Sequence, residues 1–145
     1  MSTDRKTIFM VDDDVTILTI GKNVIAKFYD VFTMNSGARM MKMLEEIVPD
    51  LILLDVEMPG DNGYDLIKIL KEEKKTQDIP VIFLTAKNDG ESELKGLSLG
   101  ANDYIIKPFS PPLLLKRLEV HLLVESQKKE IIEYKNKLQQ LADTK

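Results

Sequence analysis

The chain alternates short apolar runs with longer amphipathic segments. Five runs are rich in large aliphatic and β-branched residues, as expected of strands covered on both faces. They occupy residues 7–11, 29–34, 51–54, 81–85 and 104–107. Between them, apolar residues recur every three or four positions, as on one face of a helix, over residues 15–28, 38–48, 66–75 and 91–99. This alternation with short connections predicts an α/β fold, a parallel sheet with helices on both faces.

The third apolar run carries the strongest local signal. Four large apolar residues stop at Asp55, and a Met-Pro-Gly turn follows Glu57. A buried parallel strand that ends in aspartate presents that carboxylate at the carboxyl edge of the sheet, where open α/β folds bind ligands. Taken alone, Asp55 is equally well explained as a residue that starts the next turn. The polar residues at the other strand ends decide between the two interpretations.

Polar side chains also follow the other predicted strands. Asp12 and Asp13 follow the first strand, Thr85 ends the fourth, and Lys107 ends the fifth. In a parallel sheet all of them lie along one edge, together with Asp55. Crowded carboxylates repel one another unless a cation lies between them, and oxygen ligands without cysteine or histidine favour Mg²⁺. A threonine hydroxyl and a lysine facing this cluster suit the oxygens of a phosphoryl group.

The C-terminal part of the chain, from Leu113 onward, predicts only helix. Its first half carries leucines that we expect to cover the sheet: Leu114, Leu115, Leu118, Leu122 and Leu123. Beyond them, Val124, Ile131, Tyr134, Leu138 and Leu141 fall at a and d positions of a heptad repeat, with Gln127 as a polar exception at d. A helix this long extends past a domain of about 110–120 residues. We therefore divide the chain into a globular domain, residues 1–124, and a helical tail that resembles a coiled coil, residues 125–145.

Composition narrows the possible functions. The 145 residues are 43% hydrophobic and 30% charged, which suits one globular core. A formal net charge of −4 argues against a nucleic-acid-binding surface on this segment. The absence of cysteine and the single histidine, His121, exclude disulfides and multi-histidine metal sites. No segment has the apolar length of a signal core or membrane span, so we expect a soluble cytoplasmic protein.

Four motifs together resemble the receiver domain of two-component response regulators, over about residues 6–124. They are Val11-Asp12-Asp13-Asp14, Leu54-Asp55-Val56-Glu57-Met58-Pro59, Leu84-Thr85-Ala86 and Ile106-Lys107-Pro108-Phe109. The resemblance implies a flavodoxin-like (βα)5 fold with strand order 2-1-3-4-5. It implies a role in phosphorelay signalling, with a histidine kinase or a histidine phosphotransfer protein as partner. It also implies a protein that catalyses its own phosphorylation and dephosphorylation and is not a turnover enzyme.

The resemblance also assigns residue roles. Asp55 would accept the phosphoryl group from a phosphohistidine. Asp12, Asp13, Asp55 and the backbone carbonyl of Glu57 would bind Mg²⁺. Thr85 and Lys107 would contact the phosphoryl oxygens, and Thr85 and Tyr104 would form the switch that changes the surface of the fourth helix and fifth strand.

Some positions differ from the family pattern or are variable within the family. Asp61 stands where the family often has an apolar residue, which leaves the fine structure of its loop open. Glu57 and Lys87 occupy variable positions that, in the family, tune how fast the phosphoryl group is lost. We expect Asp14 to cap the first helix and His121 to be a structural or surface residue.

Other classes of protein fit parts of the sequence. Asp12-Asp13-Asp14-Val15-Thr16 also resembles the first motif of haloacid-dehalogenase-type phosphatases, with Asp12 as nucleophile. Those enzymes need an acidic pair after the lysine, whereas Lys107 is followed by Pro108-Phe109-Ser110-Pro111-Pro112. An interaction module without phosphorylation is disfavoured because all five site residues are present. A flavin-binding protein is disfavoured by the three carboxylates after the first strand.

The output of the domain is not specified by the sequence. No DNA-binding, cyclase or phosphodiesterase signature follows Lys107. Residues 120–141 resemble the linker helix that joins receivers to downstream effector domains, so a stand-alone receiver and a part of a multidomain regulator both remain open. The heptad positions predict a parallel homodimer through the tail.

Overall fold

A five-stranded parallel sheet forms the centre of the computed structural model, which describes residues 5–86 and 90–143. The strands lie in the order β2-β1-β3-β6-β7 and all neighbours are parallel. Their bounds are Thr7–Val11 (β1), Asp30–Met34 (β2), Leu51–Asp55 (β3), Val81–Thr85 (β6) and Asp103–Ile106 (β7). Counting only these strands along the chain, the order is 2-1-3-4-5, which confirms the predicted topology.

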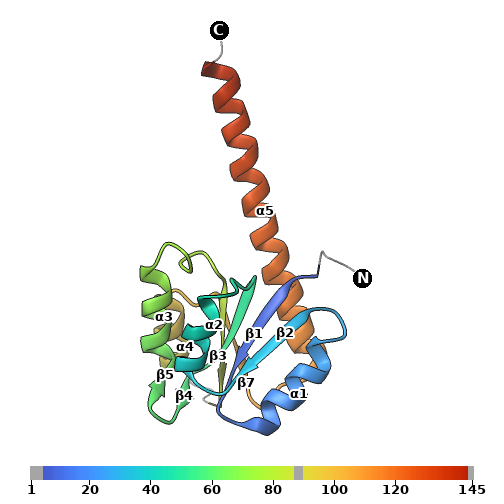
Figure 1. The fold of residues 1–145 in the computed structure, drawn as a ribbon, viewed down its shortest axis with the longest axis vertical. Helices are drawn as coiled ribbons and strands as arrows, with labels where there is room; N and C mark the ends of the chain where they lie inside the picture. The colour runs from blue at the N-terminus through green and yellow to red at the C-terminus, as the bar shows by residue number, and fades with distance from the viewer. Residues whose placement is uncertain (1–4, 87–89, 144–145) are drawn as a thin grey trace.

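Helices cover both faces of the sheet (Figure 1). One face packs against α1 (Val15–Ile25) and α5 (Pro111–Asp143), and the other against α2 (Gly37–Leu44), α3 (Gly63–Glu72) and α4 (Gly90–Ser98). The first four residues of β3 are all apolar because successive side chains of a strand point to opposite faces of the sheet, and both faces are buried. Ile52 and Leu54 enter the core on the α2–α3 face, and Leu51 and Leu53 enter the core on the α1–α5 face.

Two helices are shorter than their apolar spacing predicts. Helix α1 ends at Ile25 rather than at residue 28, and Phe28 is exposed. The Phe28 amide bonds to the Ile25 carbonyl three residues back, because the chain must turn there to enter β2. Helix α2 similarly ends at Leu44 rather than at residue 48. The helical spacing of apolar residues therefore extends into the turns that follow α1 and α2, although the helices end before these turns.

A small antiparallel hairpin follows β3 where only a turn was predicted. It consists of β4 (Glu57–Met58) and β5 (Asp61–Asn62). Gly60 in its turn has a φ of 76°, a left-handed conformation that glycine adopts without strain. Asp61 Oδ2 accepts a hydrogen bond of 2.9 Å from the Gly37 amide at the start of α2. The residue that departs from the family pattern thus attaches the hairpin to α2.

Helix α5 is 33 residues long, which corresponds to about 50 Å. Leu114, Leu118 and Leu122 are buried against the sheet, whereas Leu123 is exposed, contrary to the prediction. From Gln127 to Asp143 every residue is exposed and the helix projects away from the globule, as predicted (Figure 1). Within the described residues, no helix combines the length and apolar character needed to cross a bilayer.

Candidate functional site at the carboxyl edge of the sheet

The five polar residues at the strand ends come together in one cleft. Its volume is about 190 Å³, and it lies at the end of the sheet away from the projecting part of α5. Its lining consists of Asp12, Asp13, Asp14, Asp55, Glu57, Thr85, Ala86 and Lys107. Every residue predicted for the phosphoryl and metal site therefore lines this cleft, and Tyr104 lies outside it.

Lys107 joins two buried carboxylates at the floor of the cleft. Its ammonium Nζ lies 3.1 Å from Asp12 Oδ2 and 3.1 Å from Asp55 Oδ1. The backbone amide of Glu57 donates to the same Asp55 oxygen at 3.3 Å. Asp12 and Asp55 are almost fully inaccessible to solvent, whereas Asp13 is exposed. The two buried carboxylates are thus fixed in place, and the third borders the solvent.

Asp14 belongs to the cleft but has a structural task. Its Oδ1 accepts hydrogen bonds from the amides of Thr16 and Ile17, so it caps helix α1 as predicted. Its own amide donates to Asp12 Oδ1 at 2.9 Å. The cap of α1 therefore also orients the Asp12 carboxylate.

Burial and its charged neighbours strongly perturb the Asp55 carboxyl. Burial raises the pKa of Asp55 from 3.8 to about 7, and the neighbouring Asp12 charge adds to this rise, while Lys107 partly offsets it. Burial by itself would lower the pKa of Lys107, but its hydrogen bonds and charge interactions with Asp55 and Asp12 outweigh burial and raise it. One ammonium group therefore does not fully compensate two buried carboxylates, and a further positive charge would be favourable.

The donor set fits a hard divalent cation. Asp12, Asp13 and Asp55 each offer an oxygen, and these oxygens lie within 4.8 Å of one another. Asp55 Oδ2 is buried and accepts no hydrogen bond from the described residues. Carboxylate oxygens partly open to water are the ligands that Mg²⁺ prefers, so these residues suit the metal that the sequence predicted.

Thr85 and Tyr104 border a second, smaller space on the α4 side of the sheet. This cavity of about 10 Å³ is also lined by Phe83 and Gly96. A hydrogen bond with Glu93 of α4 raises the pKa of the Tyr104 hydroxyl. A space of this size holds about one water molecule, so the tyrosine ring enters it only if a neighbour moves.

Sequence reasoning missed a cluster that ties β7 to α5. Arg117 Nη1 donates to both oxygens of Asp103 at 2.7 and 2.6 Å, and His121 Nε2 lies 2.8 Å from Asp103 Oδ2. Burial would raise the pKa of Asp103, but the bonds with His121, Arg117 and the Tyr104 amide lower it overall. Asp103 and Arg117 lie 14 residues apart, and no local pattern marks such a pair. His121 is thus a structural residue, as predicted. Lys87, for which the sequence suggested a role beside the site, lies outside the described residues.

Comparison with known proteins assigns the family. Residues 8–119 match the family described as response regulator receiver domain. The chain is 40% identical over 116 residues to a protein of Vibrio cholerae named "Probable cyclic di-GMP phosphodiesterase", which covers 80% of this chain and 26% of that protein. It is 40% identical over 118 residues to the phosphate regulon transcriptional regulatory protein PhoB of Pseudomonas aeruginosa, covering 81% of this chain and 52% of that protein.

Solved structures give the same result. The chemotaxis protein CheY4 of Vibrio cholerae superimposes with a TM-score of 0.76 at 27% identity, covering 79% of this chain and 97% of that one. The chain therefore spans nearly a whole CheY-type protein, but only about half of PhoB and a quarter of the Vibrio relative. The haloacid-dehalogenase alternative is not supported, since the matched family is that of receivers.

Proposed function

Because the chain belongs to the response regulator receiver domain family and takes part in phosphorelay signalling, we propose that Asp55 is its phosphoacceptor. A carboxylate oxygen of Asp55 attacks the phosphorus of a phosphohistidine on a histidine kinase or histidine phosphotransfer protein. The phosphorus–nitrogen bond breaks, and the electron pair leaves with the imidazole. The product is an acyl phosphate that water later hydrolyses, regenerating Asp55.

Each residue of the cleft has a task in this transfer. Lys107 already bonds to Asp55, and its ammonium neutralises charge on the transferred phosphoryl oxygens. The Thr85 hydroxyl binds another of these oxygens. Asp12, Asp13, Asp55 and the Glu57 carbonyl hold Mg²⁺, which supplies positive charge to the attacking carboxylate and the phosphoryl group.

One observation carries the proposal most strongly. Lys107 lies 3.1 Å from a carboxylate oxygen on each of two different strand ends, so cation and anions converge where the phosphoryl group must bind. Treatment with acetyl phosphate and Mg²⁺ should add one phosphoryl group by intact-mass analysis. Asp55→Asn should gain none, and an unchanged adduct in this variant would contradict the assignment.

The output of phosphorylation is proposed to start at Thr85. Movement of Thr85 toward the phosphoryl group enlarges the cavity that it shares with Tyr104, and the ring turns inward and leaves Glu93. The changed surface of α4 and β7 then controls a partner or an output domain. We place this signalling in the cytoplasm, because a histidine kinase needs ATP to form its phosphohistidine. The relatives are regulators and a named phosphodiesterase of greater length, which supports an output domain as the target.

A second proposal concerns the projecting helix. The residues at its a and d positions, among them Ile131 and Leu138, are exposed, and burying them against a second copy is favourable. We propose a parallel homodimer through residues 124–141, of modest stability because the seam is short and contains Gln127. Sedimentation should show a concentration-dependent dimer for the whole chain and a monomer for a chain cut after Leu123.

A further inference from the structure

Asp61 lies beside the metal site but does not line the cleft. It belongs to β5, where it pairs with Met58 of β4, and the next residue, Asn62, pairs with Glu57. Glu57 lines the cleft, and its backbone carbonyl is one of the groups that we propose as Mg²⁺ ligands. The position of this carbonyl therefore depends on how the hairpin β4–β5 is held.

The Asp61 side chain joins the hairpin to a distant part of the chain. Its Oδ2 accepts the 2.9 Å hydrogen bond from the amide of Gly37, which lies 24 residues earlier. This amide belongs to the first turn of α2, where backbone donors have no partner within the helix. The Ser36 hydroxyl accepts a hydrogen bond from the Arg39 amide in the same turn. One local side chain and one side chain of the hairpin thus satisfy the start of α2.

Gly37 leaves room for this contact. A Cβ atom at this position would lie 3.2 Å from Cγ of Asp61 and 2.8 Å from both terminal methyl carbons of Leu66. Because glycine has no side chain, the carboxylate can come within hydrogen-bonding distance of the amide. The start of a helix also carries partial positive charge, which favours a carboxylate. Space, hydrogen bonding and charge therefore all favour the same position of Asp61.

Other hydrogen bonds of this segment join residues that are close in sequence. The Glu57 amide donates to Asp55 Oδ1 at 3.3 Å, and the Gly63 amide donates to the Val56 carbonyl at 2.8 Å. Such bonds give the segment its shape, but they move with it. The bond between Asp61 and Gly37 instead fixes the hairpin relative to a separate helix.

A backbone carbonyl binds a metal well only if it is already in place. When a binding-competent conformation is one of several, the apparent affinity falls by the fraction of molecules that adopt it. Mg²⁺ is sensitive to this effect because it requires nearly ideal octahedral geometry. A contact that keeps the hairpin in one position can therefore raise Mg²⁺ affinity without touching the ion.

We propose that Asp61 is a positioning residue for the metal site, because its bond to Gly37 holds the hairpin that carries the Glu57 carbonyl. This inference rests on the proposed function, since it concerns the same metal site, and it adds a residue from outside the cleft. Coupling between two sites is reciprocal. Mg²⁺ in the cleft should therefore also stabilise the hydrogen bond between Asp61 and Gly37.

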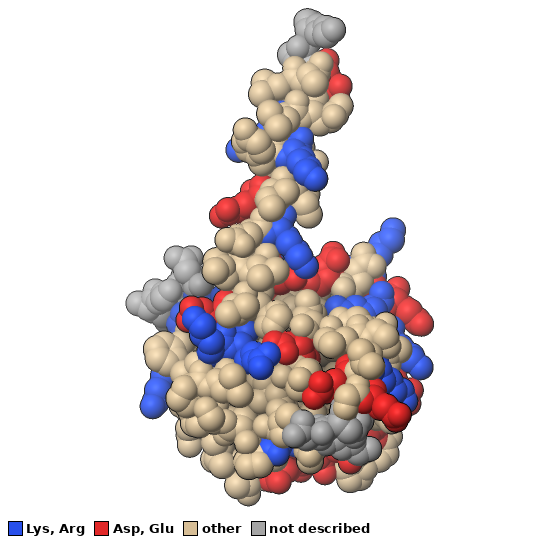
Figure 2. Space-filling model, turned by 180° about the vertical axis from the view of Figure 1, so that it is seen from behind, with Lys and Arg blue, Asp and Glu red and all other residues tan. Residues whose placement is uncertain are grey.

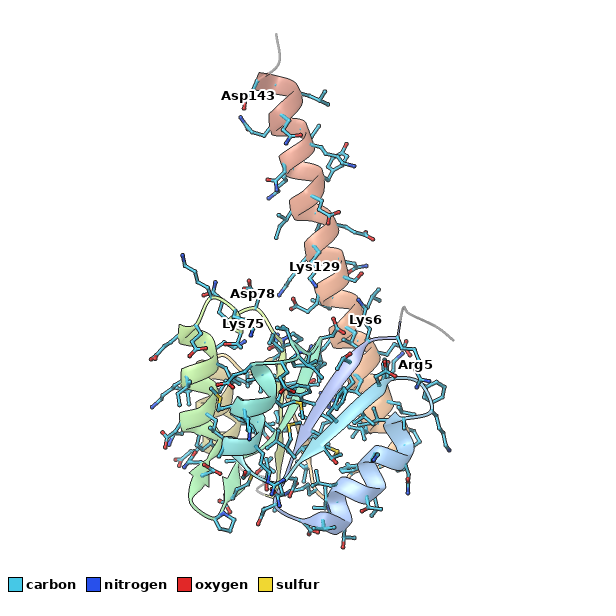
Figure 3. All side chains as sticks on the ribbon, in the orientation of Figure 1. Arg5, Lys6, Lys75, Asp78, Lys129 and Asp143 are labelled. Carbon is cyan, nitrogen blue, oxygen red and sulfur yellow. The ribbon has the colours of Figure 1, made fainter. Side chains whose placement is uncertain are left out.

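An acidic residue far from the cleft provides a control for charge. Asp78 lies at the end of the globule where α5 projects (Figure 3), in the lining of a groove that also includes Lys6, Lys75 and Lys129. On the face shown in Figure 2, acidic and basic side chains are likewise interspersed. Asp78→Ala removes the same charge as Asp61→Ala from this mixed-charge region, so it should leave Mg²⁺ affinity unchanged.

Titration of the whole chain with Mg²⁺, followed by NMR of the backbone amides, tests the proposal. Asp61→Ala should raise the Mg²⁺ dissociation constant about fivefold, as expected for the loss of one hydrogen bond. Asp61→Asn keeps an acceptor oxygen and should stay within about twofold of wild type. Ser36→Ala is the control for α2, since it removes the other side chain that satisfies the same turn, and it should bind Mg²⁺ as wild type does.

Hydrogen exchange gives a second readout that does not depend on phosphorylation. Mg²⁺ should slow exchange of the Gly37 amide in wild type and leave it unchanged in Asp61→Ala. Exchange at Gly37 that does not respond to Mg²⁺ in wild type would contradict the coupling.

The remaining outcomes separate this inference from the metal site itself. Equal weakening in Asp61→Asn and Asp61→Ala would show that the charge of Asp61 matters and its hydrogen bond does not. Equal weakening in Ser36→Ala would show that the stability of α2 is the cause. Unchanged affinity in Asp61→Ala overturns the role of Asp61 and leaves the metal site standing. A wild-type chain that binds no Mg²⁺ overturns both, while phosphorylation of Asp55 is measured separately by mass.

Discussion

Single residues of the cleft are arranged at a cost in stability. Two carboxylates, on Asp12 and Asp55, are buried and share one ammonium group, that of Lys107. Burying a carboxylate beside a second one is unfavourable: burial raises the pKa of Asp55, and the neighbouring Asp12 charge raises it further. Without a metal the site is therefore electrostatically unfavourable, and a cation bound there would relieve the repulsion.

Replacing Asp55 by asparagine should stabilise the metal-free protein at neutral and higher pH. In the folded chain the pKa of Asp55 is about 7, above its ordinary 3.8, so folding favours the protonated form. This contribution to stability is present below about pH 4 and is lost as the pH rises through 7. Asparagine never ionises, so Asp55→Asn should be more stable than wild type at pH 8, on the order of 2–4 kcal/mol.

Urea unfolding in the presence of EDTA at pH 8 and pH 5 measures this difference. The advantage of Asp55→Asn should be smaller at pH 5, because the wild-type carboxyl is then mostly protonated. A constant difference at both pH values would show that Asp55 does not titrate near 7.

Asp13→Ala should abolish tight Mg²⁺ binding and leave the fold intact. Asp13 is exposed at the mouth of the cleft and supplies one of three carboxylate oxygens that lie within 4.8 Å of one another. Its neighbour Asp14 is the matched control, since Asp14→Ala removes an equal charge but only the cap of α1, at a cost of about 1 kcal/mol. Fluorescence titration should show that Asp14→Ala binds Mg²⁺ as the wild type does and that Asp13→Ala does not. Unchanged affinity in Asp13→Ala would disprove the metal site.

Residues at strand ends could be located from the sequence, because the carboxyl ends of parallel strands lie along one edge of the sheet. Asp12 and Asp55 follow, and Thr85 and Lys107 end, apolar runs that are visible in the chain. The partners of Asp103 and Asp61 could not be located in this way. These contacts join residues 14 to 24 positions apart and depend on how helices pack, which no local pattern encodes.

At the scale of elements, the hairpin β4–β5 depends on Asp61. The Gly37 amide at the first turn of α2 donates to this carboxylate, which also interacts favourably with the positive end of the helix. Asp61→Ala should therefore lower the free energy of unfolding by about 1 kcal/mol. Asp61→Asn keeps an acceptor oxygen and should lose less, as chemical denaturation can measure; equal losses would mean that the hydrogen bond is unimportant.

Strands were predicted more accurately than helix ends. All five strands coincide within a residue at each end with their apolar runs, because burial on both faces leaves few polar residues inside them. Helices α1 and α2 end earlier than their spacing suggested, since an exposed residue such as Phe28 can continue a pattern without continuing the helix. The hairpin was missed because strands of two residues carry too little pattern.

At the scale of the molecule, α5 connects the globular domain with the segment that projects from it. The cleft lies at the carboxyl edge of the sheet. Helix α5 runs back along the sheet and projects beyond the opposite edge (Figure 1). The length of its helical pattern predicted this projection, since no domain of this size can cover so long a helix.

The most direct test of the central claim is to identify the phosphorylated residue chemically. The chain is phosphorylated by a histidine kinase or acetyl phosphate with Mg²⁺, reduced with borohydride, digested and analysed by peptide mass spectrometry. An aspartyl phosphate is reduced to homoserine, and we predict homoserine at position 55 and nowhere else. Homoserine at position 12 or 13, or none in a chain that carries a phosphoryl group, would contradict the account.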